Sequence, residues 1–185
     1  YELMLANVLS VITGNQVLWQ SLTIAIFIGG LGYGAFIADK VKDKLKVLIY
    51  SEVALAFMGA VALYIIYTIF GFINLSKFLL FISSGYDGHR VLQSEFGLDF
   101  SFLILSQFLT FIIGLCTGLE LPLLMKINDD ENIGLSEGEI LGANYFGTLL
   151  GTIVFSFFLK PKFDLIGSSI IVASFNYLVM FYLFC

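Results

Sequence analysis

The sequence predicts an all-α integral membrane protein with about six transmembrane helices. Hydrophobic residues make up 59% of its 185 residues and charged residues only 12%, about half the charged share of a soluble domain. Several apolar runs exceed the roughly 20 residues that a helix needs to cross a bilayer. These runs are long and lack the alternation of barrel strands, so we expect helices that contact the lipid bilayer.

Polar and charged segments divide the first half of the chain into three predicted helices. The first, about 1–13, is short and is followed by a Gly-Asn-Gln turn; because the chain begins with Tyr, we expect this helix to be truncated. The second, about 17–38, ends at a lysine-rich segment over 39–46. The third covers about 47–73, and a connecting loop is expected over about 76–99.

Three more helices are predicted in the second half. The fourth spans about 100–125 and ends at Lys126. The fifth spans about 138–159 and begins with Ser136 and Glu139, the spacing of a capping box. The sixth covers about 164–185. All six helices are assigned to a single transmembrane domain over 1–185.

A glutamate inside an apolar run occurs near the start of each half. Glu2 lies in Tyr-Glu-Leu-Met-Leu, and Glu120 lies in Leu-Glu-Leu-Pro-Leu. After each glutamate helix come a polar turn, a Gly-rich helix, a basic loop and a plain helix. Three helices per unit place the second unit in the opposite orientation, so we expect an inverted 3+3 repeat of about 1–75 and about 100–185.

The basic residues indicate an orientation. One face of the predicted bundle holds five basic residues and the opposite face holds four. The dense cluster of four lysines lies directly against helix ends, which places it in the cytoplasm by the positive-inside rule. The C-terminus is then cytoplasmic, in what we expect to be a bacterial inner membrane. The five basic residues are Lys40, Lys42, Lys44, Lys46 and Lys126.

Glycines at four-residue spacing indicate close helix packing. Without a hydrophobic force between helices in lipid, small residues let two backbones approach. A dinucleotide-binding role for the glycines from Gly30 is rejected, because that motif needs a preceding strand. We expect Gly32 and Gly151 to occupy equivalent helix crossings in the two repeats. The predicted packing glycines are Gly30, Gly32, Gly34, Gly114, Gly118, Gly147 and Gly151.

Five polar residues in apolar runs are candidates for a cation or polyamine site: Glu2, Glu52, Glu120, Asn144 and Tyr145. An intramembrane carboxylate usually faces a partner, a cavity or a pathway because its burial in lipid is costly. Glu52 has an alternative role near the headgroups, paired with a lysine. Glu120 has an alternative role as a hydrogen-bonded structural acid, with Asn144 and Tyr145 as its partners.

Other function classes have no support in the sequence. Nine Lys and Arg residues in total form no nucleic-acid footprint. No arrangement of catalytic residues, no metal-ligand spacing and no cofactor motif is present. We therefore assign no catalytic residue, metal or cofactor, and whether the protein takes part in an enzyme stays open.

Several motifs resemble the membrane domain of membrane-bound bacterial spermidine synthases, the polyamine aminopropyltransferases. They are Tyr1–Leu5 with Gly14–Val17, Gly30–Gly34, Gly118–Leu124, and Asn144–Gly151 continuing to Asn176. In that family a cytoplasmic Rossmann-like domain follows the last helix, binds decarboxylated S-adenosylmethionine and transfers an aminopropyl group to putrescine. We expect no such domain within these 185 residues, and their acidic segment 129–131 departs from the family pattern.

Two functional hypotheses follow. In the first, the chain binds or passes a polyamine or another small cation, held by the glutamates and by nearby aromatic faces. In the second, it is a structural anchor or interaction module for a cytoplasmic aminopropyltransferase domain or for other membrane subunits. A cavity joining Glu2 and Glu120 would favour the first hypothesis, and fully paired polar groups without a cavity would favour the second.

Overall fold

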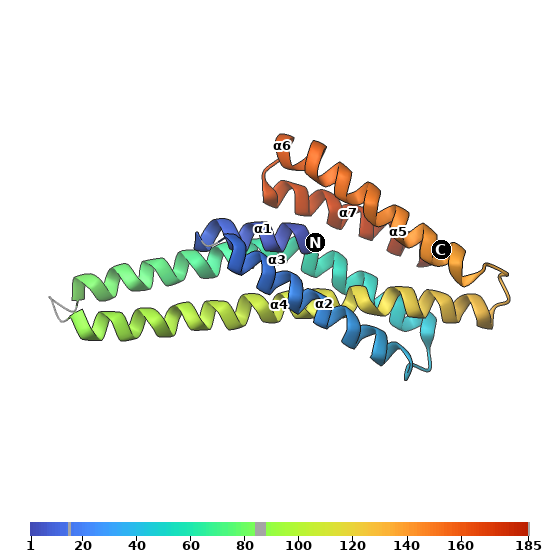
Figure 1. Cartoon of the computed structure of the whole chain (residues 1–185), viewed down its shortest axis with the longest axis horizontal. Helices are drawn as coiled ribbons and strands as arrows, with labels where there is room; N and C mark the ends of the chain where they lie inside the picture. The colour runs from blue at the N-terminus through green and yellow to red at the C-terminus, as the bar shows by residue number, and fades with distance from the viewer. Residues whose placement is uncertain (15, 84–87, 185) are drawn as a thin grey trace.

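The computed structural model describes residues 1–14, 16–83 and 88–184, and within these ranges every regular element is a helix (Figure 1). Each of the six predicted helices has a counterpart. The elements are α1 (Glu2–Thr13), α2 (Gln16–Ala38), α3 (Lys44–Ser83), α4 (Gly88–Asp130), α5 (Glu137–Val154), the π-helical turn η1 (Phe155–Leu159), α6 (Lys160–Lys162) and α7 (Leu165–Phe184).

The expected connecting loop over 76–99 is largely wrong, because α3 continues to Ser83 and α4 begins at Gly88. No glycine or proline interrupts the sequence between 72 and 83. The polar side chains of this stretch bond back to the preceding turn: Asn74 donates to the carbonyl of Phe70 at 2.9 Å, and Ser76 to that of Phe72 at 2.9 Å. These residues therefore extend the helix.

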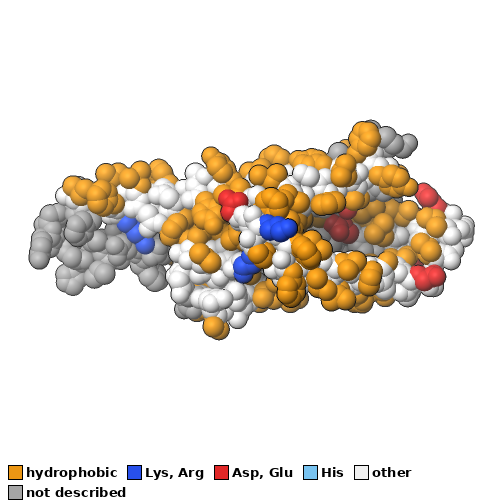
Figure 2. Space-filling model, turned by 90° about the horizontal axis from the view of Figure 1, so that it is seen from above, with side chains coloured by type: hydrophobic (Ala, Val, Ile, Leu, Met, Phe, Trp, Pro, Cys, Tyr) orange, Lys and Arg blue, Asp and Glu red, His pale blue; other side chains and the backbone are white. Residues whose placement is uncertain are grey.

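Within the described ranges, four helical segments are by length and composition able to cross a membrane: Gln16–Ala38, Lys44–Leu79, Phe100–Asp130 and Glu137–Lys162. Figure 2 shows a face covered mostly by hydrophobic side chains, with few charged groups among them. With 40 and 43 residues, α3 and α4 are about 60 Å long at 1.5 Å per residue. This length is about twice the thickness of a bilayer's hydrocarbon core.

The centre of the bundle is formed by α2, α3 and α4, with α1 packed on α2 and α7 packed on α3. Apolar side chains fill it, and Gln107 Nε2 on α4 donates a hydrogen bond to the buried Thr23 Oγ1 on α2 at 3.3 Å. The core side chains with 2% exposure or less include Leu5, Val8, Leu9, Leu55, Leu63, Ile66 and Ile113.

Four of the seven predicted packing glycines lie where α2 crosses α4. A Cβ on Gly30 would lie 2.6 Å from the carbonyl oxygen of Phe111, and a Cβ on Gly114 would lie 2.5 Å from that of Phe27. Gly34 and Gly118 face the opposite helix even more closely. Only residues without a side chain allow the α2 and α4 backbones to approach this closely.

Gly32, Gly147 and Gly151 differ from this pattern, because nothing lies within 4 Å of the position that a Cβ would take on any of them. The expectation that Gly32 and Gly151 occupy equivalent close helix crossings is therefore wrong, because both glycines face open space. The physical reason is the position of α5, which is the least buried of the four long apolar segments. In Figure 1, α5 diverges from the central helices after the turn that follows α4.

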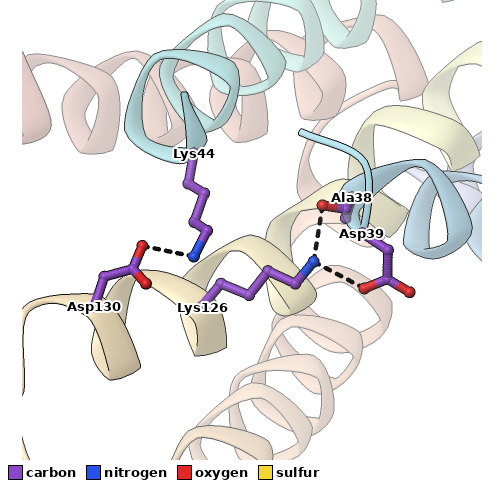
Figure 3. A network of polar contacts seen from close by, with 5 residues as sticks. All are labelled: Ala38, Asp39, Lys44, Lys126 and Asp130. Carbon is purple, nitrogen blue, oxygen red and sulfur yellow. Dashed lines mark hydrogen bonds and ion pairs between the residues drawn. The ribbon is translucent and has the colours of Figure 1, made fainter. Parts of the chain in front are cut away.

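The ends of α2, α3 and α4 are joined by polar contacts (Figure 3). Lys126 Nζ lies 2.8 Å from Asp39 Oδ1 and donates to the carbonyl of Ala38 at 3.0 Å. Lys44 Nζ lies 2.5 Å from Asp130 Oδ2. The hydrogen bond and positive charge of Lys126 lower the pKa of the exposed Asp39 carboxyl below its ordinary value. These contacts hold three helix ends together at one end of the bundle.

The predicted capping box at the start of α5 is confirmed. Ser136 Oγ accepts a hydrogen bond from the Glu139 amide at 3.3 Å, and Glu139 Oε2 accepts one from the Ser136 amide at 2.8 Å. Both bonds satisfy backbone donors that a helix start leaves free. They define where α5 begins after the turn that follows α4.

Candidate functional site

A cavity of about 680 Å³ lies between α1, α2 and α4 on one side and α5, η1 and α7 on the other. Residues from α1, α2, α4, α5, η1 and α7 line it, so it joins the two halves of the chain. Glu2 from the first half and Glu120 from the second both line this cavity, together with Asn144. Gly32 and Gly151 line it too, and their missing side chains leave room inside it.

Glu120 is positioned by a proline-containing turn of α4. Pro122 lies inside this helix and lines the cavity with Glu120 and Gly118. Proline has no N–H, so the carbonyl of Gly118, four residues earlier, receives no bond from the helix ladder. Thr117, on the same wall, uses its hydroxyl to donate to the carbonyl of Ile113 at 3.0 Å. This stretch of α4 therefore offers a carboxyl group and a backbone carbonyl without its helical partner.

The cavity is acidic and contains no basic side chain. Its described lining includes two carboxyl groups and no Lys, Arg or His. None of Glu2, Glu52 and Glu120 has a hydrogen bond or ion pair among the residues that the structure describes. Glu52, on α3, lies outside the lining but interacts electrostatically with Glu120. No side chain of the described lining thus supplies a counter-charge to these two carboxyl groups.

Glu2 is positioned by the way that α1 begins. Tyr1, next to it, places its ring against α3 at Gly59, where any side chain would overlap the ring. The Tyr1 hydroxyl accepts a hydrogen bond from Asn176 Nδ2 of α7 at 3.3 Å. The start of α1 is therefore attached to α3 and α7, and Glu2 follows in its first turn.

The five candidate residues do not all lie in the cavity. Glu2, Glu120 and Asn144 line it, and Glu52 lies close enough to Glu120 to interact through charge. Tyr145 is absent from the lining and its side chain is 67% exposed. A one-residue step along α5 turns the side chain by about 100°, which separates Asn144 from its neighbour.

Two cavity residues were missed from the sequence. Thr148 and Thr152 line the cavity with Asn144, and Thr148 Oγ1 donates to the carbonyl of Asn144 at 2.9 Å. Asn144, Thr148 and Thr152 are spaced four residues apart, which places their side chains on one face of the helix. This polar stripe on an otherwise apolar helix was the signal that could have identified them.

The helices and this cavity define a class of protein: an all-helical chain with segments of membrane-spanning length and an acidic cavity between its halves. Among the residues that the structure describes, no group of three or more His, Cys, Asp or Glu side chains could hold a metal ion. No protein-family model matches the chain, and no solved structure matches it significantly.

The chain is similar to curated bacterial proteins named polyamine aminopropyltransferase. The protein of Shewanella oneidensis is 28% identical over 188 residues, 98% of this chain and 32% of the relative. That of Oceanobacillus iheyensis is 27% identical over 179 residues, 95% of this chain and 30% of the relative. That of Leptospira interrogans is 26% identical over 179 residues, with the same two shares.

These relatives confirm the resemblance drawn from the sequence motifs. The similarity extends over nearly the whole chain, while the chain spans only about a third of the length of the relatives. It is therefore similar to one part of each polyamine aminopropyltransferase.

Proposed function

We propose that this chain is the membrane domain of a spermidine-synthase-like protein and that it binds or passes a polyamine or a similar small organic cation. The observation that carries the proposal is the cavity, which joins Glu2 and Glu120 without a basic side chain in its lining. The names of the similar proteins, which refer to polyamines, favour an amine as the cation.

The chemistry of the cavity suits an elongated ammonium ion. A carboxylate removed from water needs a positive partner or a proton, and no lining side chain supplies the positive charge. The carbonyl of Gly118 and the side-chain oxygens of Asn144 and Thr152 add acceptors for N–H groups. Phe27 and Phe155 provide aromatic surface for cation–π attraction and for the methylene chain of the ligand.

A thermal-shift titration of the purified protein in detergent tests this proposal. Putrescine and spermidine should each raise the unfolding temperature of the parent in a saturable way, because a ligand of the folded state stabilises it. Glu120→Gln should abolish the rise. Glu137→Gln is the matched control, because this exposed acid on α5 lies outside the cavity. Equal shifts in all three proteins would contradict a site at Glu120.

A structural role is the alternative. The chain would anchor a cytoplasmic aminopropyltransferase domain or a partner subunit at the membrane. The observations favouring it are that the similar proteins extend far beyond the matched region and that α5 exposes much of its apolar surface. Purified protein that shows no thermal shift with millimolar polyamines would favour this alternative.

The membrane arrangement forms part of the proposal. The four long apolar segments would cross a bacterial inner membrane, and the shorter apolar helices α1 and α7 would complete the set of six. The 39–46 segment and the end of α7 would lie in the cytoplasm. Segments of about 1–75 and about 100–185 would form inverted repeats, with the cavity at their interface. Two observations support the repeat: each half contributes one glutamate and one open-faced glycine to the cavity.

A further inference from the structure

A second hollow, of about 310 Å³, lies where α3 begins and α4 ends. Three lysines and three acidic residues line it: Lys42, Lys44, Lys46, Asp43, Asp130 and Glu131. Its charged lining is therefore neutral overall, unlike that of the acidic cavity. The hollow takes no part in the amine site proposed above.

Two of the three lysines are paired inside this hollow. Lys44 Nζ lies 2.5 Å from Asp130 Oδ2, the contact that joins α3 to α4 in Figure 3. Lys46 Nζ lies 3.2 Å from Asp43 Oδ2.

One cation and one anion are left over. Neither the Lys42 ammonium nor the Glu131 carboxylate has a hydrogen bond or ion pair among the residues that the structure describes, and both residues are exposed. The hollow thus presents one free ammonium and one free carboxylate.

The hollow also has apolar lining residues, and it lies at the ends of two helical segments of membrane-spanning length. Leu45, 47% exposed, and Ile127 line it beside the charged groups. One apolar segment of membrane-spanning length begins at Lys44, and another ends at Asp130. If these segments cross the bilayer as proposed, the hollow lies at the level of the lipid headgroups.

We propose that this hollow binds a phospholipid headgroup that carries both a phosphate and a primary ammonium group, as phosphatidylethanolamine does. The phosphate would lie at Lys42, and the ammonium would donate hydrogen bonds to Glu131. The glycerol and upper acyl carbons would contact Leu45 and Ile127. A purely anionic headgroup fits less well, because it brings no cation to the unpaired carboxylate of Glu131.

The test compares lipids in nanodiscs of otherwise identical composition. We expect the unfolding temperature to be about 3 °C higher with phosphatidylethanolamine than with phosphatidylcholine, whose quaternary ammonium cannot donate a hydrogen bond. Phosphatidylglycerol, which has the phosphate without the ammonium, should also give the lower value. Equal stabilisation by all three lipids, or stronger stabilisation by phosphatidylglycerol, would overturn the proposal.

Single substitutions locate the effect. Lys42→Gln and Glu131→Gln should each remove the preference for phosphatidylethanolamine, and both residues are exposed, so the fold should be retained. Lys40→Gln is the control: this lysine of the same segment lies 4.5 Å from the ring centre of Phe36 and outside the hollow. Glu120→Gln should keep the preference, which separates this inference from the amine site. A preference that survives both Lys42→Gln and Glu131→Gln would refute it.

Discussion

At the scale of single residues, the charges of this protein fall into two groups. Asp39 and Lys126 form an ion pair at the helix ends, with 72% and 27% of their side chains exposed. Glu120 instead lines a cavity in which no basic residue faces it. Ion pairs at the helix ends join α2, α3 and α4, whereas the described lining of the cavity offers Glu120 no basic side chain.

The pair of Asp39 and Lys126 gives a pH prediction. Because the folded protein lowers the pKa of Asp39, the pair adds stability above the ordinary aspartate pKa of about 3.9, and this stability is lost as pH falls through the lower, folded value. Lys126→Met should return the pKa of Asp39 toward its ordinary value and remove the associated loss of stability in acid. Carboxyl NMR of the ¹³C-labelled protein measures the pKa directly. An unchanged pKa in the variant would contradict the ion pair.

Two glycines on α2 offer a matched test of packing. A Cβ at Gly34 would overlap the backbone of α4, whereas at Gly32 it would meet nothing within 4 Å. Gly34→Ala should therefore destabilise the protein by about 1–3 kcal/mol through overpacking. Gly32→Ala should be neutral or stabilising by up to about 1 kcal/mol, because alanine favours the helix. Thermal unfolding in detergent compares them, and equal stabilities would show that the α2–α4 crossing is wrong.

At the scale of elements, α5 differs from the other long helices because it contributes a wall of the cavity and little of the core. Asn144, Thr148 and Thr152 lie on its cavity face, while Tyr145 and Phe146 are 67% and 62% exposed on other faces. The helix therefore separates a polar face from surfaces that are suited to lipid.

This division predicts different effects for neighbouring substitutions. Asn144→Leu should weaken polyamine binding about tenfold, the effect of losing one hydrogen bond to a charged group. Tyr145→Phe should leave affinity unchanged, because the tyrosine lies outside the cavity lining. Equilibrium dialysis with labelled spermidine gives both affinities. A larger loss for Tyr145→Phe than for Asn144→Leu would mean that α5 turns its other face to the ligand.

Much of the element pattern could be predicted, for identifiable reasons. Apolar runs between charged segments located the helices, and the capping box located the start of α5. The continuation of α3 to Ser83 was missed because Asn74 and Ser76 look like loop residues, yet they bond to the helix backbone. The open surroundings of Gly32 could not be predicted from the sequence. Glycine spacing shows which faces of a helix could pack closely, but it does not show which of these faces contacts another helix.

At the scale of the whole molecule, the candidate site depends on contacts between distant parts of the chain. Two repeated glutamates in apolar runs predicted that Glu2 and Glu120 share a site, and the structure places both on one cavity. Glu2 and Glu120 are 118 residues apart, so the suspected repeat was the feature of the sequence that predicted a shared site for them. The threonines of α5 were overlooked because an isolated threonine in an apolar helix usually bonds to its own backbone.

The orientation proposed for the whole chain can be tested with reporter fusions. Figure 1 shows α7 running back toward the end of the bundle where α4 connects to α5, the end that also holds the lysine-rich segment. A reporter fused after α7 should be active when it is of a type that functions in the cytoplasm and silent when it requires the periplasm. Activity of the periplasmic type alone would reverse the proposed orientation.

The most direct test of the central claim is calorimetric titration of spermidine into the purified protein, its Glu120→Gln variant and its Glu137→Gln variant. The account predicts saturable binding to the parent and to Glu137→Gln, weakened by added salt because the attraction is between charges. It predicts at least about tenfold weaker binding to Glu120→Gln, the loss expected when a charged partner is removed. Saturable binding of equal affinity to all three proteins, or none to any of them, would contradict a cation site in the cavity between the two halves.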